Sequence, residues 1–190
     1  PLIVKAAGHE QMISPGAHWV VSYDPANGRE FWRARHGNGF SIGSCPVFNE
    51  GVAYFSTGCM KPQMCAFRVD GEGDVTTTHA SWKTMRQVPV MSSPVMIGDE
   101  IFWTSDDGMA NCADAKSGDA FWQERLNQQH LASPLLAEGR VYFFGKDGKC
   151  TVVRADKKFE KLSENQLEGT VIATPAIVDR TIYLRTDTHL

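Results

Sequence analysis

The segment SSPVMIGDEIFWTSDDGMANCADAKSGDAFW, residues 92–122, decides the fold. Its short apolar runs are separated by turn sequences, Gly98-Asp99 after the first run and Asp107-Gly108 after the second. Asp-Gly between two such runs predicts a tight hairpin, because glycine accepts the positive φ that the turn requires. Pro94 suits the first residue of a strand, where its missing N–H costs the hydrogen-bond ladder least. The segment therefore predicts four short antiparallel strands and no helix.

The same pattern recurs along the chain. Its proline lies at positions 46, 94, 134 and 175, at intervals of 48, 40 and 41, and Pro1 lies 45 residues before Pro46. Four antiparallel strands in a repeat of about 40–50 residues are typical of a β-propeller blade. We therefore expect an all-β fold, a single partial β-propeller over residues 1–190. Its four-stranded blades span approximately residues 1–40, 41–88, 89–129 and 130–170, and a two-stranded partial fifth blade spans 171–190.

Two nonapeptides share an Asp, a Gly and a Trp at intervals of four residues. They are DPANGREFW, with Asp24, Gly28 and Trp32, and DAKSGDAFW, with Asp114, Gly118 and Trp122. Aspartate can cap its own turn by accepting an N–H bond two residues on, and glycine supplies the left-handed conformation. A Trp on the outer strand can then pack on the neighbouring blade and donate its indole N–H to a backbone carbonyl. We expect the same of Trp82, at a longer spacing from Asp70, and interpret the motif as structural.

The second repeat is longer than the third because of two insertions, GCMKPQMC and GEGDVTTTHAS. Surface loops are where repeat proteins vary, so we expect both insertions to protrude and to be the first choice for contact with a partner. The candidate contact residues are Lys61, Pro62, Gln63 and Met64 in the first insertion and Asp74 and Thr76 in the second. The fourth repeat differs in another way, because its segment RADKKFEKL lacks the Asp-Gly-Trp pattern.

Composition excludes several classes of function. With 42% hydrophobic and 22% charged residues, the chain can bury a core and is not of a disordered type. A net charge of −3 does not suggest a nucleic-acid-binding face, which needs clustered Lys and Arg. No run approaches the roughly 18 apolar residues of a membrane-spanning helix, so no transmembrane segment is expected.

No candidate catalytic or metal site emerges from the sequence. The six histidines form neither an HExxH motif nor a zinc-type Cys/His spacing. The five cysteines include no adjacent pair and no CxxC. Cys59 and Cys65 are close enough in sequence for a bridge across a turn, whereas Cys112 and Cys150 lie in strand-like runs and are expected to be buried. We therefore expect no enzymatic activity, no cofactor and no metal.

With its repeats aligned, the sequence resembles the PQQ-like repeat family of β-propellers. The family pattern is approximately Ser-Pro, an apolar run, Gly-x-Val-Tyr, Asp-Gly, then Ala-x-Asp-x-x-Thr-Gly-x-x-x-Trp, and Ser117 stands where Thr is usual. The family includes quinoprotein dehydrogenases and the outer-membrane assembly lipoprotein, and similar sequences of planctomycete-type bacteria occur beside serine/threonine kinase domains. The resemblance implies a longer protein, commonly of seven or eight blades, in the periplasm or otherwise outside the cytoplasm.

The resemblance leaves two classes of function open. The first is a non-catalytic scaffold that binds a protein or peptide at its rims or by strand addition at an exposed edge. The alternative is a sensor region of a kinase-related protein or a fragment of a quinone-dependent dehydrogenase. Dehydrogenases of this family hold the quinone with a vicinal Cys-Cys disulfide, a Trp platform and a Ca²⁺ ion. No adjacent cysteines occur here, which favours the scaffold.

Four repeats and two further strands would leave blade faces open that a closed ring covers. An exposed apolar edge promotes association, so we expect the 190-residue chain to form a homo-oligomer through these edges. Light scattering at high protein concentration should report a mass above that of one chain. A strictly monomeric mass would contradict the prediction.

Overall fold

The computed structural model describes residues 1–37, 39 and 41–190. These residues form β-strands joined by turns and loops and no helix, which confirms the all-β prediction. Accordingly, none of them belongs to a helix of the length and apolarity needed to cross a membrane. The chain divides into two compact units, Pro1–Ser93 and Pro94–Leu190, which are described separately below.

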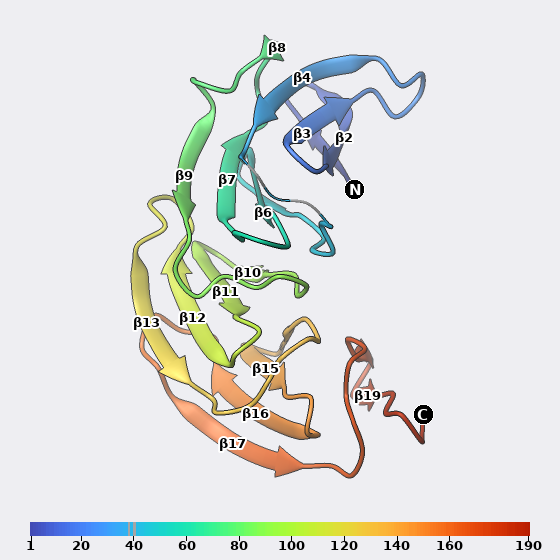
Figure 1. Ribbon diagram of the computed structural model, residues 1–190, viewed down its shortest axis with the longest axis vertical. Coiled ribbons are helices and arrows are strands. Elements are labelled where there is room, and N and C mark those ends of the chain that lie inside the picture. Colours follow the sequence, from blue (N-terminus) through green and yellow to red (C-terminus); the bar gives the residue numbers. More distant parts are fainter. Residues whose placement is uncertain (38, 40) are drawn as a thin grey trace. The chain divides into compact units, whose positions relative to one another are not determined.

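The first unit contains two sheets (Figure 1). The first sheet has the order β1-β2-β3-β4-β8, with strands β1 (Leu2–Ala6), β2 (His9–Pro15), β3 (Trp19–Tyr23), β4 (Glu30–Arg35) and β8 (Gly73–Asp74). The second sheet has the order β5-β6-β7-β9, with β5 (Val47–Asn49), β6 (Val52–Ser56), β7 (Met64–Arg68) and β9 (Ala80–Thr84). Neighbouring strands are antiparallel except for β8, which pairs parallel to β4.

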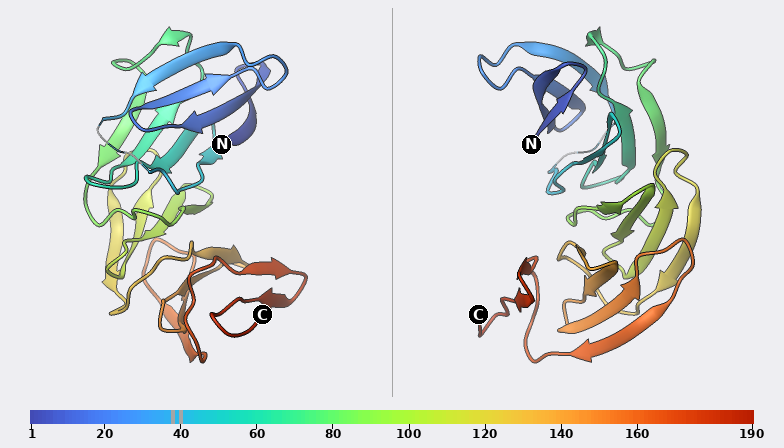
Figure 2. Two further views of the ribbon diagram at one scale, coloured as in Figure 1. Left: turned by 45° about the vertical axis from the view of Figure 1, so that its right-hand side comes forward. Right: turned by 180° about the vertical axis from the view of Figure 1, so that it is seen from behind.

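The second unit contains two four-stranded antiparallel sheets and a hairpin. The first sheet comprises β10 (Val95–Ile97), β11 (Glu100–Thr104), β12 (Met109–Asp114) and β13 (Ala120–Arg125). The second comprises β14 (Leu135–Ala137), β15 (Arg140–Phe144), β16 (Lys149–Arg154) and β17 (Lys161–Gln166). The hairpin of β18 (Ala176–Val178) and β19 (Thr181–Tyr183) is the dark red segment in Figure 2. The predicted four-stranded repeats and two-stranded remainder are thus present.

Strand β8 corrects one expectation from the sequence. The insertion GEGDVTTTHAS does not protrude, because its first part adds to the edge of β4, with Gly73 opposite Trp32 and Asp74 opposite Arg33. The first sheet therefore has five strands instead of four. An edge strand presents unpaired N–H and C=O groups, and β8 satisfies part of this edge from within the chain.

The inner strands such as β6 and β11 are buried on both faces, whereas the outer strand β4 alternates buried and exposed residues. In the first unit, Trp32 of β4 lies in one apolar cluster with Phe55 and Phe67 of the second sheet. In the second unit, Trp122 of β13 lies in a cluster with Phe102 of its own sheet and Phe143 of the next. Each unit is therefore held together by apolar side chains shared between neighbouring sheets.

The third and fourth strands of every four-stranded repeat share one irregularity. The register shifts between Ser22 and Tyr23, between Ala66 and Phe67, between Cys112 and Ala113, and between Val152 and Val153. A bulge of this kind bends the strand and increases its twist. The bulge occurs in the fourth repeat as well, so it does not depend on the Asp-Gly-Trp pattern.

The hairpins between the first and second strands make tight turns with left-handed residues. Ala7 and Gly8 have φ values of 51° and 85°, and Glu138 and Gly139 have 49° and 69°. Two consecutive positive φ angles are the mark of a type I′ turn, for which Asn-Gly is the preferred sequence. The chain thus carries non-glycine residues in a conformation that costs them about 1–2 kcal/mol.

Ala7→Asn should stabilise the first sheet by about 0.5–1 kcal/mol, because Asn adopts the left-handed conformation more readily than Ala. Ala7 is exposed, so no packing is lost. Urea unfolding should show a higher midpoint for the variant. Ala7→Val should lower the midpoint, since a β-branched residue is strained at positive φ; equal midpoints for the two variants would refute the explanation.

Candidate partner-contact surface and blade-docking motif

The two Asp-Gly turns have the same geometry. Asp24 Oδ1 accepts a hydrogen bond from the Ala26 N–H at 2.9 Å, and Asp114 Oδ1 accepts one from the Lys116 N–H at 2.7 Å. Gly28 and Gly118 both have a φ of 77°. The aspartate caps its turn and the glycine allows the chain to reverse, as the spacing predicts.

Trp122 joins two neighbouring sheets of the second unit. Its side chain is 8% exposed, and its indole Nε1–H donates to the backbone carbonyl of Asp156 at 3.0 Å. Its ring lies edge-on to Phe159, with ring centroids 5.1 Å apart. Asp156 and Phe159 belong to the turn between β16 and β17, so this one side chain provides both an apolar contact and a hydrogen bond to the next sheet.

Trp32 makes its hydrogen bond differently from the sequence prediction. Its side chain is fully buried, and its Nε1–H donates to Gln11 Oε1 of its own sheet at 3.0 Å. The Gln11 amide in turn donates to the Val69 carbonyl of the next sheet at 3.1 Å, and Ser22 Oγ donates to Gln11 Oε1 at 2.7 Å. The fully buried Gln11 therefore relays the link between the two sheets.

Gln11 was not found from the sequence, because a single glutamine in the strand HEQMISP carries no recognisable pattern. The strand register shows that Glu100 occupies in the second unit the position of Gln11 in the first. Glu100 directly precedes the residue of β11 that pairs with Ala113, and Gln11 directly precedes the corresponding residue of β2. Glu100 also reaches the next sheet, where its carboxylate lies 3.7 Å from Lys157 Nζ. A polar residue at this position thus links neighbouring sheets in both units.

Trp82 lies on the outer strand β9, as expected, but Asp70 is not the partner that the sequence suggested. The Trp82 side chain is half-buried, and the centroid of its ring lies 6.0 Å from that of the Tyr54 ring. The backbone bond from Arg68 N–H to the His79 carbonyl takes the place of the bond from Asp24 N–H to the Arg29 carbonyl. Arg68 is therefore the structural counterpart of Asp24.

The four-and-four spacing nevertheless recurs in the second repeat, as Asp74, Thr78 and Trp82. Asp74 Oδ1 accepts a hydrogen bond from the Thr76 N–H at 3.1 Å, as Asp24 does from Ala26. The hydroxyl and N–H bonds from Thr76, together with the nearby Arg33 guanidinium, lower the pKa of the Asp74 carboxyl. The spacing was present in the sequence and was missed because Asp70 lies closer to the end of the third strand.

Residues 70–79 form a strap that fastens the two sheets of the first unit. Val75 is 4% exposed and belongs to the apolar cluster around Trp32. The Val75 N–H donates to the Arg33 carbonyl at 2.9 Å, and Thr76 Oγ1 accepts from the Arg35 N–H at 2.9 Å. Asp74 and Thr76, both proposed from the sequence as contact residues, thus lie in the strap instead of in a protruding loop.

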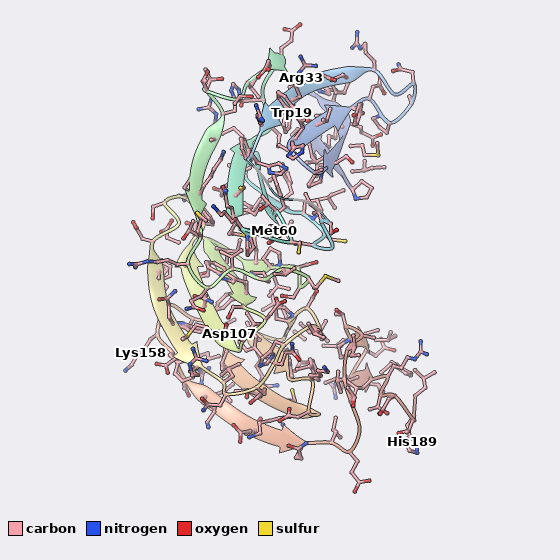
Figure 3. All side chains as sticks on the ribbon, in the orientation of Figure 1. Trp19, Arg33, Met60, Asp107, Lys158 and His189 are labelled. Carbon is pink, nitrogen blue, oxygen red and sulfur yellow. The ribbon has the colours of Figure 1, made fainter. Side chains whose placement is uncertain are left out.

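The other insertion does form an enlarged loop, residues 57–63, between β6 and β7. Two bonds close it, from the Thr57 N–H to the Gln63 carbonyl and from the Gln63 N–H to Thr57 Oγ1, both at 2.9 Å. Met60 lies in the middle of the loop with 73% of its surface exposed (Figure 3). In the second unit, the corresponding turns have only three residues between the bonded positions, as in Ser105 to Met109.

The candidate residues of this loop differ in accessibility. Lys61 is exposed, and Pro62 and Gln63 are half-buried. Met64 is fully buried in β7 and lies outside any contact surface, contrary to the sequence expectation, because it already belongs to the strand. Met60, which was not among the candidates, is the most exposed apolar side chain of the loop.

The cysteines make no disulfide, and Cys59 and Cys65 are not bridged. Burial raises the pKa of the Cys65 and Cys112 thiols to about 12 and that of Cys150 to about 11. These thiols remain protonated at neutral pH and are poor nucleophiles. Within residues 1–37, 39 and 41–190, no three His, Cys, Asp or Glu side chains are grouped so that they could hold a metal ion.

His130 is a fully buried histidine in the connection after β13. Its backbone N–H donates to the Asp106 carbonyl at 3.1 Å, but neither ring nitrogen has a hydrogen-bond partner in the described part of the chain. Burial lowers the pKa of His130 to about 4, and the nearby Phe144 backbone and Asp147 carboxylate offset only part of this effect. The ring is therefore neutral at physiological pH.

Comparison with known proteins gives matches to one family and one fold. The sequence pattern of the family described as outer membrane protein assembly factor BamB matches residues 16–189. No curated protein sequence matches the chain. The crystal structure of BamB from Moraxella catarrhalis is similar with a TM-score of 0.74 at 18% identity, over 97% of this chain and 54% of that one.

Two further solved structures share the fold. The computationally designed Ika8 protein matches with a TM-score of 0.71 at 11% identity, over 95% of this chain and 53% of that one. A europium-containing methanol dehydrogenase matches with a TM-score of 0.50 at 13% identity, over 66% of this chain and 24% of that one. The chain thus spans about half the length of the first two structures, and the likeness concerns the β-propeller fold alone.

Trp122→Ala should lower the free energy of unfolding by about 3–5 kcal/mol, as for other buried large-to-small changes. Trp122→Phe keeps most of the apolar contact but leaves the Asp156 carbonyl without its donor, and should cost about 1–2 kcal/mol. Thermal and urea unfolding measure both. A nearly unchanged melting temperature for Trp122→Ala would contradict the docking role.

His130→Val should flatten the acid dependence of stability. The pKa of His130 is about 4 in the folded state, whereas that of an unfolded histidine is about 6.5. At pH values between these two pKa values, His130 binds a proton in the unfolded state and remains neutral in the folded state. Stability is therefore unaffected above about pH 6.5 and falls by up to about 3 kcal/mol as the pH drops towards 4. Val171 occupies the corresponding buried position in the next repeat, so valine suits the site.

Urea unfolding at several pH values between 4 and 7 measures this slope. Burial also lowers the pKa of His36, so the slope should decrease without vanishing. His18→Gln is the control, because His18 is exposed. An undiminished slope in His130→Val would show that another group causes the acid sensitivity.

Proposed function

Because the chain belongs to the family of outer membrane protein assembly factor BamB, a family of PQQ-like repeat β-propellers, we propose that it is the scaffold portion of a longer protein that binds a protein or peptide partner. The observation that carries the proposal is the enlarged loop 57–63, which exposes Met60. A flexible, polarisable methionine suits adaptable contact surfaces. In the other repeats whose second and third strands the structure describes, the corresponding turn is shorter, so the loop distinguishes this repeat from its neighbours.

The backbone conformation and the hydrogen bonds of the loop hold Met60 in an exposed position. Met60 has a φ of 76°, which for a non-glycine residue is uncommon and costs about 1–3 kcal/mol. The two bonds between Thr57 and Gln63 hold the base of the loop on the rigid hairpin of β6 and β7. An exposed apolar residue on a fixed base supports a role in contact.

The proposal includes no catalytic activity. The buried thiols of Cys65, Cys112 and Cys150 lie on separate strands, and the sequence has no adjacent cysteines, so these residues do not fit a quinone held by a vicinal disulfide. Calorimetric titration with pyrroloquinoline quinone and Ca²⁺ should give no specific heat. Heat with a defined stoichiometry would instead favour the dehydrogenase hypothesis.

A periplasmic or otherwise extracytoplasmic location is the second part of the proposal. It is supported by the description of the family as an outer membrane protein assembly factor. Self-association is the third part, supported by apolar residues on the β18–β19 hairpin, where Val178 is 54% and Tyr183 is 55% exposed. A second copy or further blades of the longer protein would cover this surface.

Site-specific photocrosslinking tests the partner-binding loop. A photoreactive residue replaces Met60 in the complete protein, expressed in its own cells, and a matched control replaces Glu138, which lies exposed at the tip of another hairpin. We expect a discrete polypeptide adduct from position 60 and none from position 138. Adducts of equal yield at both positions, or none at position 60, would contradict the proposal.

A loop-shortening variant completes the test. Replacing Gly58–Pro62 with Asp-Asp-Gly, the turn of residues 106–108, gives this hairpin the length found in the second unit. Co-purification of the partner identified by crosslinking should be lost at least ten-fold, while the melting temperature stays within a few degrees. Retained co-purification would exclude the loop as the contact surface.

A further inference from the structure

Three exposed methionines lie at one end of the first unit, the end at which β4, β6 and β9 finish. Met60 projects from the loop after β6, whereas Met85 and Met91 lie in the connection 85–93 after β9 and are 59% and 50% exposed. Among the described residues of this unit, the only other large apolar side chain that is exposed is Ile3. Exposed apolar residues that gather in one place mark interaction sites.

The loop and the connection are in contact. The Ser56 hydroxyl, at the base of the loop, donates a hydrogen bond to the Pro89 carbonyl of the connection at 2.5 Å. The chain before β5 packs on the same connection, because a Cβ atom at Gly43 would lie 3.4 Å from Met91 Cε. The exposed methionines therefore come from two segments that touch, and the three residues are called the methionine surface below.

The fold itself does not require methionine on this surface. Met85 lies three residues after Trp82, and Arg125 takes its place three residues after Trp122 in the next repeat. The Arg125 guanidinium pairs with the Asp107 carboxylate instead of exposing an apolar group. A position that accepts a charged residue in one repeat does not need an apolar residue for packing in another.

The same end of the first unit offers free positive charges. Residues 41–46, 57–63 and 85–93 include Lys61 and Arg86 and contain no Asp or Glu. Both of these basic side chains are exposed, and neither makes an ion pair or a side-chain hydrogen bond with any residue that the structure describes. Two unpaired cations therefore flank the methionine surface.

Lys83 adds a further positive charge at this end, because its ammonium donates to the carbonyl of His36, the residue after β4, at 3.3 Å. The strap lies at the opposite end of the unit and carries three carboxylates, those of Asp70, Glu72 and Asp74. The positive charge around the methionine surface is thus a local feature of a chain whose net charge is −3.

We propose that the methionine surface binds an acidic segment of the protein partner, in which apolar side chains stand between Asp or Glu residues. The apolar side chains contact Met60, Met85 and Met91, and the carboxylates pair with Lys61 and Arg86. This inference rests on the proposed function and specifies the chemistry of its partner. An anionic membrane is the less suitable ligand, because it calls for a cluster of about four to eight Lys and Arg residues.

Fluorescence anisotropy with a labelled peptide, Asp-Leu-Asp-Phe-Asp-Leu-Asp, tests this chemistry on the 190-residue chain. We expect a dissociation constant on the order of 0.1 mM that rises about three- to five-fold between about 50 and 200 mM NaCl, because salt screens the charges. Two control peptides, with Lys in place of every Asp or with Ser in place of Leu and Phe, should bind at least about ten-fold more weakly. Equal binding of the Asp and Lys peptides, or no saturable binding of the Asp peptide, would overturn the proposal.

Variants assign the binding to this surface. Lys61→Glu, Arg86→Glu and Met85→Ser should each weaken binding of the Asp peptide about five- to ten-fold. Lys158→Glu, on an exposed turn of the second unit (Figure 3), is the matched control and should not change it. All four side chains are exposed, so the melting temperature should stay within a few degrees. Equal weakening by Lys158→Glu and the other charge variants would overturn the proposal.

Photocrosslinking separates this inference from the proposed function. In the complete protein in its own cells, a photoreactive residue at position 85 should capture the same polypeptide as one at position 60. Mass spectrometry should place both crosslinks in a segment that carries Asp or Glu beside apolar residues. Ala26, exposed in the turn between β3 and β4, is the control position and should give no adduct.

The possible failures are distinguishable. An adduct from position 60 but none from position 85, or crosslinks in a segment without acidic residues, would overturn this inference alone and leave the loop as a contact site. The absence of an adduct from position 60 would contradict the proposed function itself. Binding of the chain to phosphatidylglycerol vesicles without binding of the Asp peptide would overturn the inference in favour of a membrane surface.

Discussion

The packing of neighbouring sheets in each unit depends on how an outer-strand tryptophan is held against the next sheet. Burying an indole gains a large apolar contact, but its N–H then needs an acceptor. The chain meets this requirement in two ways. Trp122 reaches the Asp156 carbonyl of the next sheet directly. Trp32 donates to Gln11, whose amide passes the link to the Val69 carbonyl.

These two solutions show that the repeats conserve a contact more strictly than the residues that make it. The position of Gln11 is taken by Glu100 in the second unit, where the link to the next sheet becomes an ion pair with Lys157. An ion pair whose lysine is exposed contributes less than about 1 kcal/mol, whereas a buried amide that loses its partners costs more. The direct bond from Trp122 therefore carries most of the link in the second unit, and Gln11 carries it in the first.

The sequence predicted the fold well because its information is local and repeated. Strands, hairpins and the Asp-Gly turns follow from residues that lie close together in the chain, such as Asp24 and Gly28. The role of Gln11 was not predictable, because it depends on Val69, a residue 58 positions away. The prediction that the strap protrudes was wrong for a similar reason. Whether Asp74 protrudes or pairs depends on the free edge of β4, which no local pattern reveals.

The strap also limits how far the repeats are interchangeable modules. Residues 70–79 belong by sequence to the second repeat, yet Val75 completes the apolar cluster of the first. Excising or permuting the second repeat would therefore uncover Trp32 and the β4 edge at the same time. Recombination among propeller genes at the boundary near residue 41 would separate the first sheet from β8, the strand that pairs with its edge. The first two repeats are therefore better regarded as one structural pair than as two exchangeable modules.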